Sequence, residues 1–133
     1  MIKKILIAIS FLAVMGGYAG YYLWNKPHKK VENMEAINIT SETLSKEYNE
    51  NEKVADRMYL NKAIEISGTV DQIDKNLDGG TMIIFQSTDS LSSIQCSMRE
   101  KSISVSKGQK VIIRGLCSGS GITGISLTDC VLK

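Results

Sequence analysis

The sequence of 133 residues is poor in the side chains that most active sites use. It contains a single histidine, His28, and nucleophilic catalysis needs a base beside the nucleophile. The three cysteines show no C-x-x-C spacing, and no histidine completes a set of four ligands, so a zinc site is not expected. We therefore predict no metal, no other cofactor and no enzyme activity.

One long apolar run lies at the N-terminus. No residue from Ile5 to Trp24 is charged, and a helix of that length spans the ~30 Å hydrocarbon core of a bilayer. Four aromatic residues, which favour the headgroup zone, gather at its end: Tyr18, Tyr21, Tyr22 and Trp24. This pattern predicts a transmembrane signal anchor over residues 1–25. A cleaved signal peptide, with a cleavage site near Gly17–Ala19, is the alternative.

Both interpretations place the rest of the chain outside the cytoplasm, because a short N-terminal tail usually stays inside. For a bacterial cell this compartment is the periplasmic side of the cell membrane. No cysteine lies near the apolar run, so we do not expect a lipid-modified N-terminus.

The net charge of +2 comes from the N-terminal segment. Residues 1–30 carry five lysines and no acidic residue, which leaves 11 basic and 14 acidic side chains, a net charge of −3, in residues 31–133. The lysines beside the apolar run suit anionic lipid headgroups. The rest of the chain lacks the positive charge that is typical of nucleic-acid-binding domains.

The chain after the anchor divides into three parts. Residues 26–39 are polar and without a sustained period, which predicts a tether. Residues 40–61 have helical spacing, with Thr40 or Ser41 as the N-cap and a break at Asn49–Asn51. The apolar positions of this helical segment are Leu44, Tyr48, Val54, Ala55, Met58 and Tyr59.

Residues 62–133 change to a period of two, which predicts five strands. In the first strand Ile64, Ile66, Gly68 and Val70 share one face, and Gly68 in mid-strand indicates a bend or bulge. The third strand alternates Ile94, Cys96 and Met98, and the fourth alternates Val111, Ile113 and Gly115. The connection over residues 99–109 has room for a single helical turn. The pattern favours an all-β, five-stranded OB-type barrel over a small sandwich.

Two glycine-rich stretches resemble ligand loops and are better explained as turns. Residues 74–79 match the first half of a calcium loop, but the twelfth position, which needs a bidentate glutamate, is Phe85. GSGITG, residues 119–124, lies between two strands, whereas a phosphate loop leads into a helix. We predict a hairpin turn at each of them, the second centred on Ser120.

Several stretches also resemble the bacterial tRNA-anticodon-binding-like OB family: YLNKAIEISGTVDQIDK, IQCSM, KGQKVIIRGLCSG and ISLTDCVL. The resemblance implies an OB barrel with an N-terminal anchor. By analogy with that fold, a ligand would lie across the second and third strands, which places Met82, Ile84, Gln86, Gln95 and Ser97 at the site.

The OB fold also affects which cysteines could form a disulfide. Cys117 and Cys130 are predicted to be about 23 Å apart along the last hairpin, which is too far for a disulfide. The third and fifth strands of an OB barrel run side by side and parallel, so Cys96 and Cys130 are the predicted pair if a disulfide forms. Three unbonded core thiols are the alternative.

These observations predict a membrane-anchored, non-enzymatic OB-fold binding module of the cell envelope. An envelope protein or a small polar ligand would be its partner. The alternative is a protein that binds single-stranded nucleic acid or tRNA, as the fold suggests. Phe85 is the only aromatic residue in residues 60–133, and single-strand binders stack bases on aromatic rings.

Overall fold

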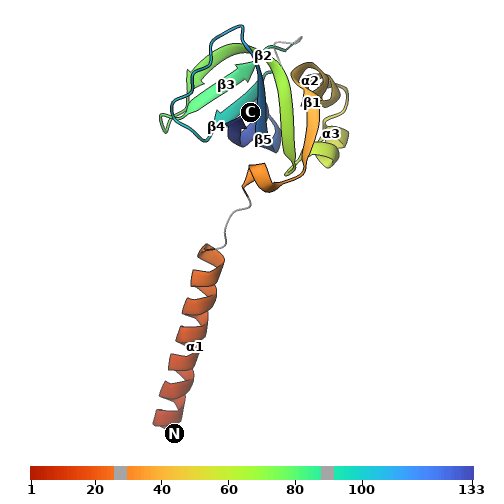
Figure 1. Ribbon diagram of the computed structural model, residues 1–133. Coiled ribbons are helices and arrows are strands. Elements are labelled where there is room, and N and C mark those ends of the chain that lie inside the picture. The colour runs from red at the N-terminus through yellow and green to blue at the C-terminus, as the bar shows by residue number, and fades with distance from the viewer. Residues whose placement is uncertain (26–29, 88–91) are drawn as a thin grey trace.

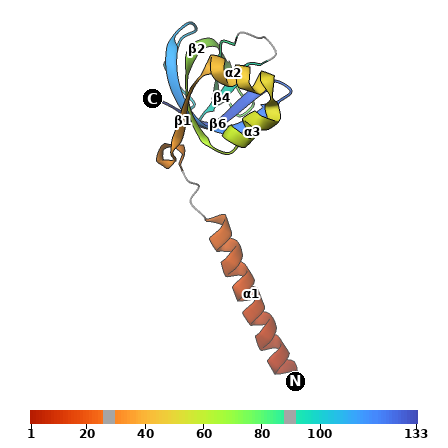
Figure 2. The same cartoon turned by 90° about the vertical axis from the view of Figure 1, so that its right-hand side faces the viewer.

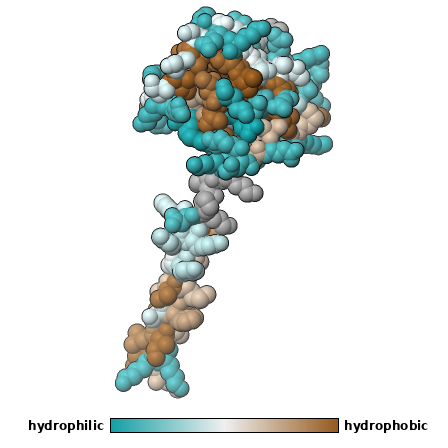
Figure 3. Space-filling model, viewed as in Figure 1, coloured by the Kyte–Doolittle hydropathy of each residue, from teal (hydrophilic) through white to brown (hydrophobic). Residues whose placement is uncertain are grey.

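A long helix and a small β-barrel make up the molecule (Figure 1). The computed structural model describes residues 1–25, 30–87 and 92–133. Helix α1, Ile2–Trp24, contains an 18-residue window with a mean hydropathy of 1.6, and none of its residues is buried. Its 23 residues extend about 34 Å, so it could cross a membrane by length and composition. In Figure 3 its N-terminal half is the more apolar, after the two lysines.

Five strands close into the predicted barrel. They are β2 (Ala63–Lys75), β3 (Thr81–Phe85), β4 (Ile94–Met98), β5 (Lys110–Gly121) and β6 (Gly124–Leu132). Neighbouring strands follow the order β2-β3-β4-β6-β5, and β2 pairs with β5 to complete the circle. All pairs in the ring are antiparallel except β4 with β6, which run parallel as expected for an OB barrel.

The barrel interior is filled by the alternating apolar residues of these strands. Burial of the inward positions removes them from water, which is the main favourable contribution to folding. The fully buried strand residues with larger side chains are Ile64, Ile66, Val70, Ile83, Phe85, Ile94, Cys96, Ile113, Cys117, Ile125, Leu127 and Cys130.

Two short helices pack on one side of the barrel (Figure 2). They are α2, Ser41–Glu50, and α3, Glu52–Tyr59. Thr40 is the N-cap of α2, and Asn51 both ends α2 and caps α3, as the predicted break indicated. Leu44, Tyr48, Ala55 and Tyr59 belong to the core. Val54 and Met58 do not: they are exposed on the outer side of α3, because the buried side of this short helix is filled by Ala55 and Tyr59.

The tether predicted over residues 26–39 is in large part structured. Residues Val31–Asn33 form a 3-10 helix, η1, and residues Ala36–Thr40 form strand β1, which pairs in parallel with the first half of β2. Val31 is buried, and Ile37 and Ile39 pack against the core. The strand carries no clear sequence pattern, because it is only five residues long and its partner lies 27 positions further along the chain.

Gly68 in β2 and Gly115 in β5 have different structural roles. The strand irregularity in β2 falls between Val70 and Gln72, so Gly68 is not the bulge that the sequence indicated. A Cβ at Gly68 would come within 2.4 Å of Ser41 Oγ, so this glycine lets α2 approach β2 closely. In β5 the register shifts between Arg114 and Leu116, so the irregularity of this strand falls at Gly115.

The connections show two differences from prediction. Residues 76–80 form the predicted turn between β2 and β3, closed by hydrogen bonds between Asn76 and Gly80. The β5–β6 turn is centred on residues 122–123, two positions later than predicted. No helical turn is present in residues 99–109; Ile103 and Val105 anchor this connection against the core instead.

Candidate binding face

Four of the five predicted site residues share the outer face of β3 and β4. Met82 lies opposite Ser97, and Ile84 lies opposite Gln95, in the antiparallel register of these strands. All four are partly exposed, whereas the residues between them point into the core. This outer surface of β3 and β4 is called the β3–β4 face below. Figure 3 shows an apolar area on the front of the barrel, bordered by hydrophilic residues.

Strand β2 adds two polar residues that sequence reasoning missed. Gln72 lies opposite Ile84, and Asp74 lies opposite Met82. The Gln72 amide donates to both carboxylate oxygens of Asp74, each at 2.8 Å. The irregularity after Val70 brings Gln72 to the outer surface, whereas unbroken alternation would have turned it inward.

Gln95 is held in place by the neighbouring hairpin. Its side-chain nitrogen donates to the carbonyl oxygen of Thr123 at 3.0 Å, and the Ser93 hydroxyl donates to the same oxygen at 2.7 Å. The β3–β4 face therefore offers an oriented amide, a hydroxyl at Ser97 and two apolar side chains.

Gln86, the fifth predicted residue, lies apart from this group. It follows the end of β3, and its backbone N–H donates to the carbonyl of Thr69. Its side chain lines a surface groove of about 660 Å³ between the start of α2 and strands β2 and β5. Other residues lining the groove include Thr40, Ser67, Lys110, Ile112 and Lys133. The groove forms where β1 leaves the sheet, which no local sequence pattern indicates.

Aromatic rings are absent from the β3–β4 face. Phe85 is 1% exposed and fills the centre of the core. Tyr48 and Tyr59 lie under the helices: burial and a hydrogen bond to Glu47 raise the pKa of Tyr59 to about 12. Burial and a hydrogen bond with Cys117 raise the pKa of Tyr48. None of these rings can stack on a ligand at the surface.

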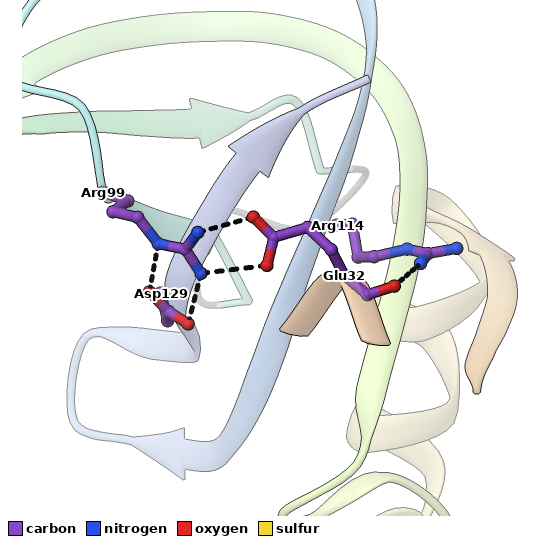
Figure 4. A network of polar contacts seen from close by, with 4 residues as sticks. All are labelled: Glu32, Arg99, Arg114 and Asp129. Carbon is purple, nitrogen blue, oxygen red and sulfur yellow. Dashed lines mark hydrogen bonds and ion pairs between the residues drawn. The ribbon is translucent and has the colours of Figure 1, made fainter. Parts of the chain in front are cut away.

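The two arginines of the barrel bind acidic residues, and Figure 4 shows their contacts with Glu32 and Asp129. Arg99 contacts Asp129 through two nitrogens, each at 2.6 Å, and also contacts the Glu32 carboxylate. Arg114 donates to Glu65 at 2.9 Å and to the Glu32 carbonyl at 3.1 Å. Glu32 thus joins the segment after α1 to the barrel, and these five residues are called the juxtamembrane clasp.

The clasp also lowers the pKa values of its two glutamates. The hydrogen bond from Arg99 lowers the pKa of Glu32, and the hydrogen bond from Arg114 lowers the pKa of Glu65. Both carboxylates are therefore held in the charged form at neutral pH. These negative charges form ion pairs with Arg99 and Arg114 within the protein.

All three cysteines are buried free thiols. Cys117 lies opposite Leu127, so Cys130 is three residues beyond the facing position. This offset is about 10 Å along the strand, and not the predicted separation of about 23 Å. Cys96 and Cys130 are neighbours on the parallel strands β4 and β6: a hydrogen bond with Cys130, together with burial, raises the pKa of Cys96. The disulfide between them stays a prediction.

No cluster of three or more histidine, cysteine or acidic side chains suited to a metal ion occurs in the described residues 1–25, 30–87 and 92–133. His28 lies outside these residues.

The closed barrel, with its parallel β4–β6 pair and capping helices, is an OB-type domain. The model of the tRNA_anti-like family matches residues 1–131, so the chain belongs to the tRNA_anti-like family. A comparison with curated proteins gave no significant match.

The solved structures that are similar to the chain include the following two. A "putative nucleic acid-binding lipoprotein" from Klebsiella pneumoniae subsp. pneumoniae MGH 78578 has a TM-score of 0.57 and 15% identity, over 81% of this chain and 99% of that chain. A "putative aspartyl-tRNA synthetase" from Leishmania major Friedlin has a TM-score of 0.46 and 12% identity, over 81% of this chain and 22% of that chain. At these identities the likeness of the first structure shows the fold alone.

Proposed function

We propose that this protein is a membrane-anchored, non-enzymatic binding module of the cell envelope, with its ligand on the β3–β4 face. The anchor would be α1. The ligand would be an envelope protein or a small polar molecule, because the face combines Met82 and Ile84 with the amides of Gln72 and Gln95 and the hydroxyl of Ser97.

One observation carries this proposal over nucleic-acid binding: Phe85, the only aromatic residue of the barrel, is buried in the core. Single-strand-binding barrels use exposed rings as stacking platforms and a positive groove along the backbone. Here Asp74 adds a negative charge beside Met82, and Arg99 and Arg114 are paired with carboxylates.

Nucleic-acid binding remains the second candidate, because the Klebsiella structure of the same fold is described in those terms. Its site would need cations that lie off the β3–β4 face. The two candidates differ in salt dependence: phosphate contacts release counterions, so nucleic-acid affinity falls steeply as salt rises.

The first experiment uses a photoreactive amino acid at Ile84 in the full chain, expressed in its native membrane. Ile112 is the matched control, an exposed isoleucine on β5 in the groove described above. We expect a crosslinked product from position 84 and none from position 112. Crosslinking from position 112 alone would move the ligand to the groove and overturn the proposed face.

The second experiment measures binding of the detergent-solubilised full chain to single-stranded DNA and RNA oligonucleotides over a salt series. We expect weak binding or none. Tight binding with a steep salt dependence would overturn the proposal in favour of the nucleic-acid candidate.

The compartment can be tested with Asp78→Cys, a change in the exposed β2–β3 turn. The native cysteines are fully buried, so a membrane-impermeant maleimide should modify only the new thiol. Labelling in intact cells is expected for a periplasmic barrel. Labelling that requires cell lysis would place the barrel in the cytoplasm.

A further inference from the structure

Helix α3 has an exposed side that combines cations with apolar residues. Ala55 and Tyr59 face the core. At 100° per residue the outward sector of the helix carries Lys53, Val54 and Arg57, and Met58 lies at the edge of this sector, one turn after Val54. Val54 is 46% exposed and Met58 is 39% exposed. Val54 and Met58 lie four residues apart, so they form one exposed apolar strip beside Lys53 and Arg57.

The acidic residues of α3 lie on a different side. Glu52 and Asp56 are rotated away from Arg57 and Met58, and Asp56 accepts a hydrogen bond from the Tyr48 hydroxyl at 3.1 Å. Lys62 extends the cationic side, because its Nζ lies 3.5 Å from the carbonyl oxygen of Arg57. The residues Lys53, Val54, Arg57, Met58 and Lys62 are called the α3 patch.

The patch lies next to the segment that arrives from the membrane anchor. Residues 33–37 and 61–63 line one surface hollow, so Lys62 borders the chain between η1 and β1. That chain is held on the barrel by the buried Val31, by the pairing of β1 with β2 and by the juxtamembrane clasp. The attachment point is therefore fixed relative to the patch.

The distance from the anchor to this point is limited by chain length. Helix α1 ends at Trp24 and η1 begins at Val31, a separation of seven residues that reaches at most about 25 Å when fully extended. A domain of about 100 residues has a radius of gyration of about 13 Å. The diameter of the barrel is more than twice this radius, so it exceeds the reach of the connecting chain. The side that carries the attachment point must stay close to the bilayer.

We propose that the α3 patch binds the anionic lipid surface of the membrane in which α1 is anchored. Lys53, Arg57 and Lys62 would contact the lipid phosphates, and Val54 and Met58 would enter the headgroup region. Tethering raises the effective concentration of the surface, so a small patch suffices. Because α3 packs on α2 and β5, this orientation leaves the β3–β4 face available to a ligand. The proposal rests on membrane anchoring by α1.

The test uses the full chain in nanodiscs made of phosphatidylcholine, with or without phosphatidylglycerol. An environment-sensitive fluorophore is attached to Met58→Cys, in the patch, or to Asp78→Cys, at the opposite end of β2. A third label, at Tyr21→Cys, reports on the anchor. The buried native cysteines stay unlabelled. We expect a blue shift at position 58 that requires phosphatidylglycerol, is lost at high salt, and is absent at position 78.

Charge-reversal variants distinguish lipid binding by the α3 patch from a general effect of the net charge of the protein. Lys53→Glu, Arg57→Glu and Lys62→Glu together should abolish the shift at position 58, and all three side chains are exposed, so folding should persist. The matched control reverses Lys75, Lys101 and Lys107, which are also exposed, and should keep the shift.

Two results would overturn the inference: a water-like signal at position 58 in anionic nanodiscs, or an equal loss of the shift in the control triple variant. The label at position 21 distinguishes failure of the α3 patch from failure of the membrane anchor on which the proposed function depends. A bilayer signal at position 21 with a water-like signal at position 58 refutes only the patch, whereas a water-like signal at position 21 refutes the anchor itself.

Discussion

Gly115 is the position where adding a single methyl group should test the packing of the barrel most directly. A Cβ there would lie 2.5 Å from Cys130 Sγ, and 3.3 Å from both Leu127 Cβ and the Thr128 carbonyl oxygen. Unstrained contacts between such heavy atoms are about 3.5–4.0 Å, so the methyl group overlaps the sulfur by about 1 Å. We therefore predict that Gly115→Ala is destabilising.

The expected size of the effect follows from this overlap. Overpacking a filled core costs about 1–3 kcal/mol. For a domain of about 100 residues, 1 kcal/mol changes Tm by at least about 4 °C, so a loss of about 2 kcal/mol lowers Tm by about 10 °C. The measurement is thermal unfolding of the full chain in detergent, followed by circular dichroism, with urea unfolding as a second measure of the free energy.

Two further variants identify the cause. Gly121→Ala is the matched control, because its Cβ would have only the Gly124 carbonyl oxygen nearby, at 4.0 Å, and we expect no loss of stability. Cys130→Ala removes the clashing sulfur, so the double variant should be more stable than the two single losses predict, by about 1 kcal/mol. Gly115→Ala with the stability of Gly121→Ala, or a double variant with no such gain, would refute the packing described here.

Three other predictions concern the helix cap, the clasp and the thiols. Thr40→Ala removes the acceptor for the Thr43 N–H and should cost about 1 kcal/mol in urea unfolding, whereas Thr43→Ala keeps that acceptor and should cost less. Because Arg99 lowers the pKa of Glu32, the ionised clasp stabilises the fold above the ordinary carboxyl pKa of about 4.3, and this stability is lost as the pH falls through the lower folded-state value. Glu32→Gln should therefore flatten the dependence of Tm on pH on the acid side; an unchanged slope would contradict this role. If the barrel is periplasmic, mass spectrometry of protein isolated without reductant should find Cys96 linked to Cys130, and three free thiols would disprove the pairing.

The candidate face shows how far local patterns reach. Alternation along two short strands was enough to place Met82, Ile84, Gln95 and Ser97 on one outer surface. Gln86 lies apart from these four residues, because β3 ends one residue earlier, at Phe85, and the Gln86 backbone N–H donates to the Thr69 carbonyl.

Gln72 and Asp74 were missed for a different reason. A single irregularity in β2 reverses which residues point outward, and a shift of one residue exchanges the two faces of a strand. The alternation of Ile64, Ile66 and Val70 upstream therefore gave the wrong side for Gln72.

The sequence by itself determined the features that depend on neighbouring residues. These are the apolar helix from Ile2 to Trp24, the capped helices that meet at Asn51, and the five barrel strands with the β2–β3 turn. Helical and strand periods are local properties, and so are capping and turn preferences, because each depends on residues a few positions apart.

Only the tertiary structure decided the contacts between distant segments. Ala36 pairs with Ala63, and Arg99 reaches Glu32 across 67 positions, so the presumed tether became part of the barrel. The same holds for the exposure of Met58, which depends on how much of α3 the barrel can cover. Such contacts require the closed barrel to bring the partners together, and no period along the chain encodes them.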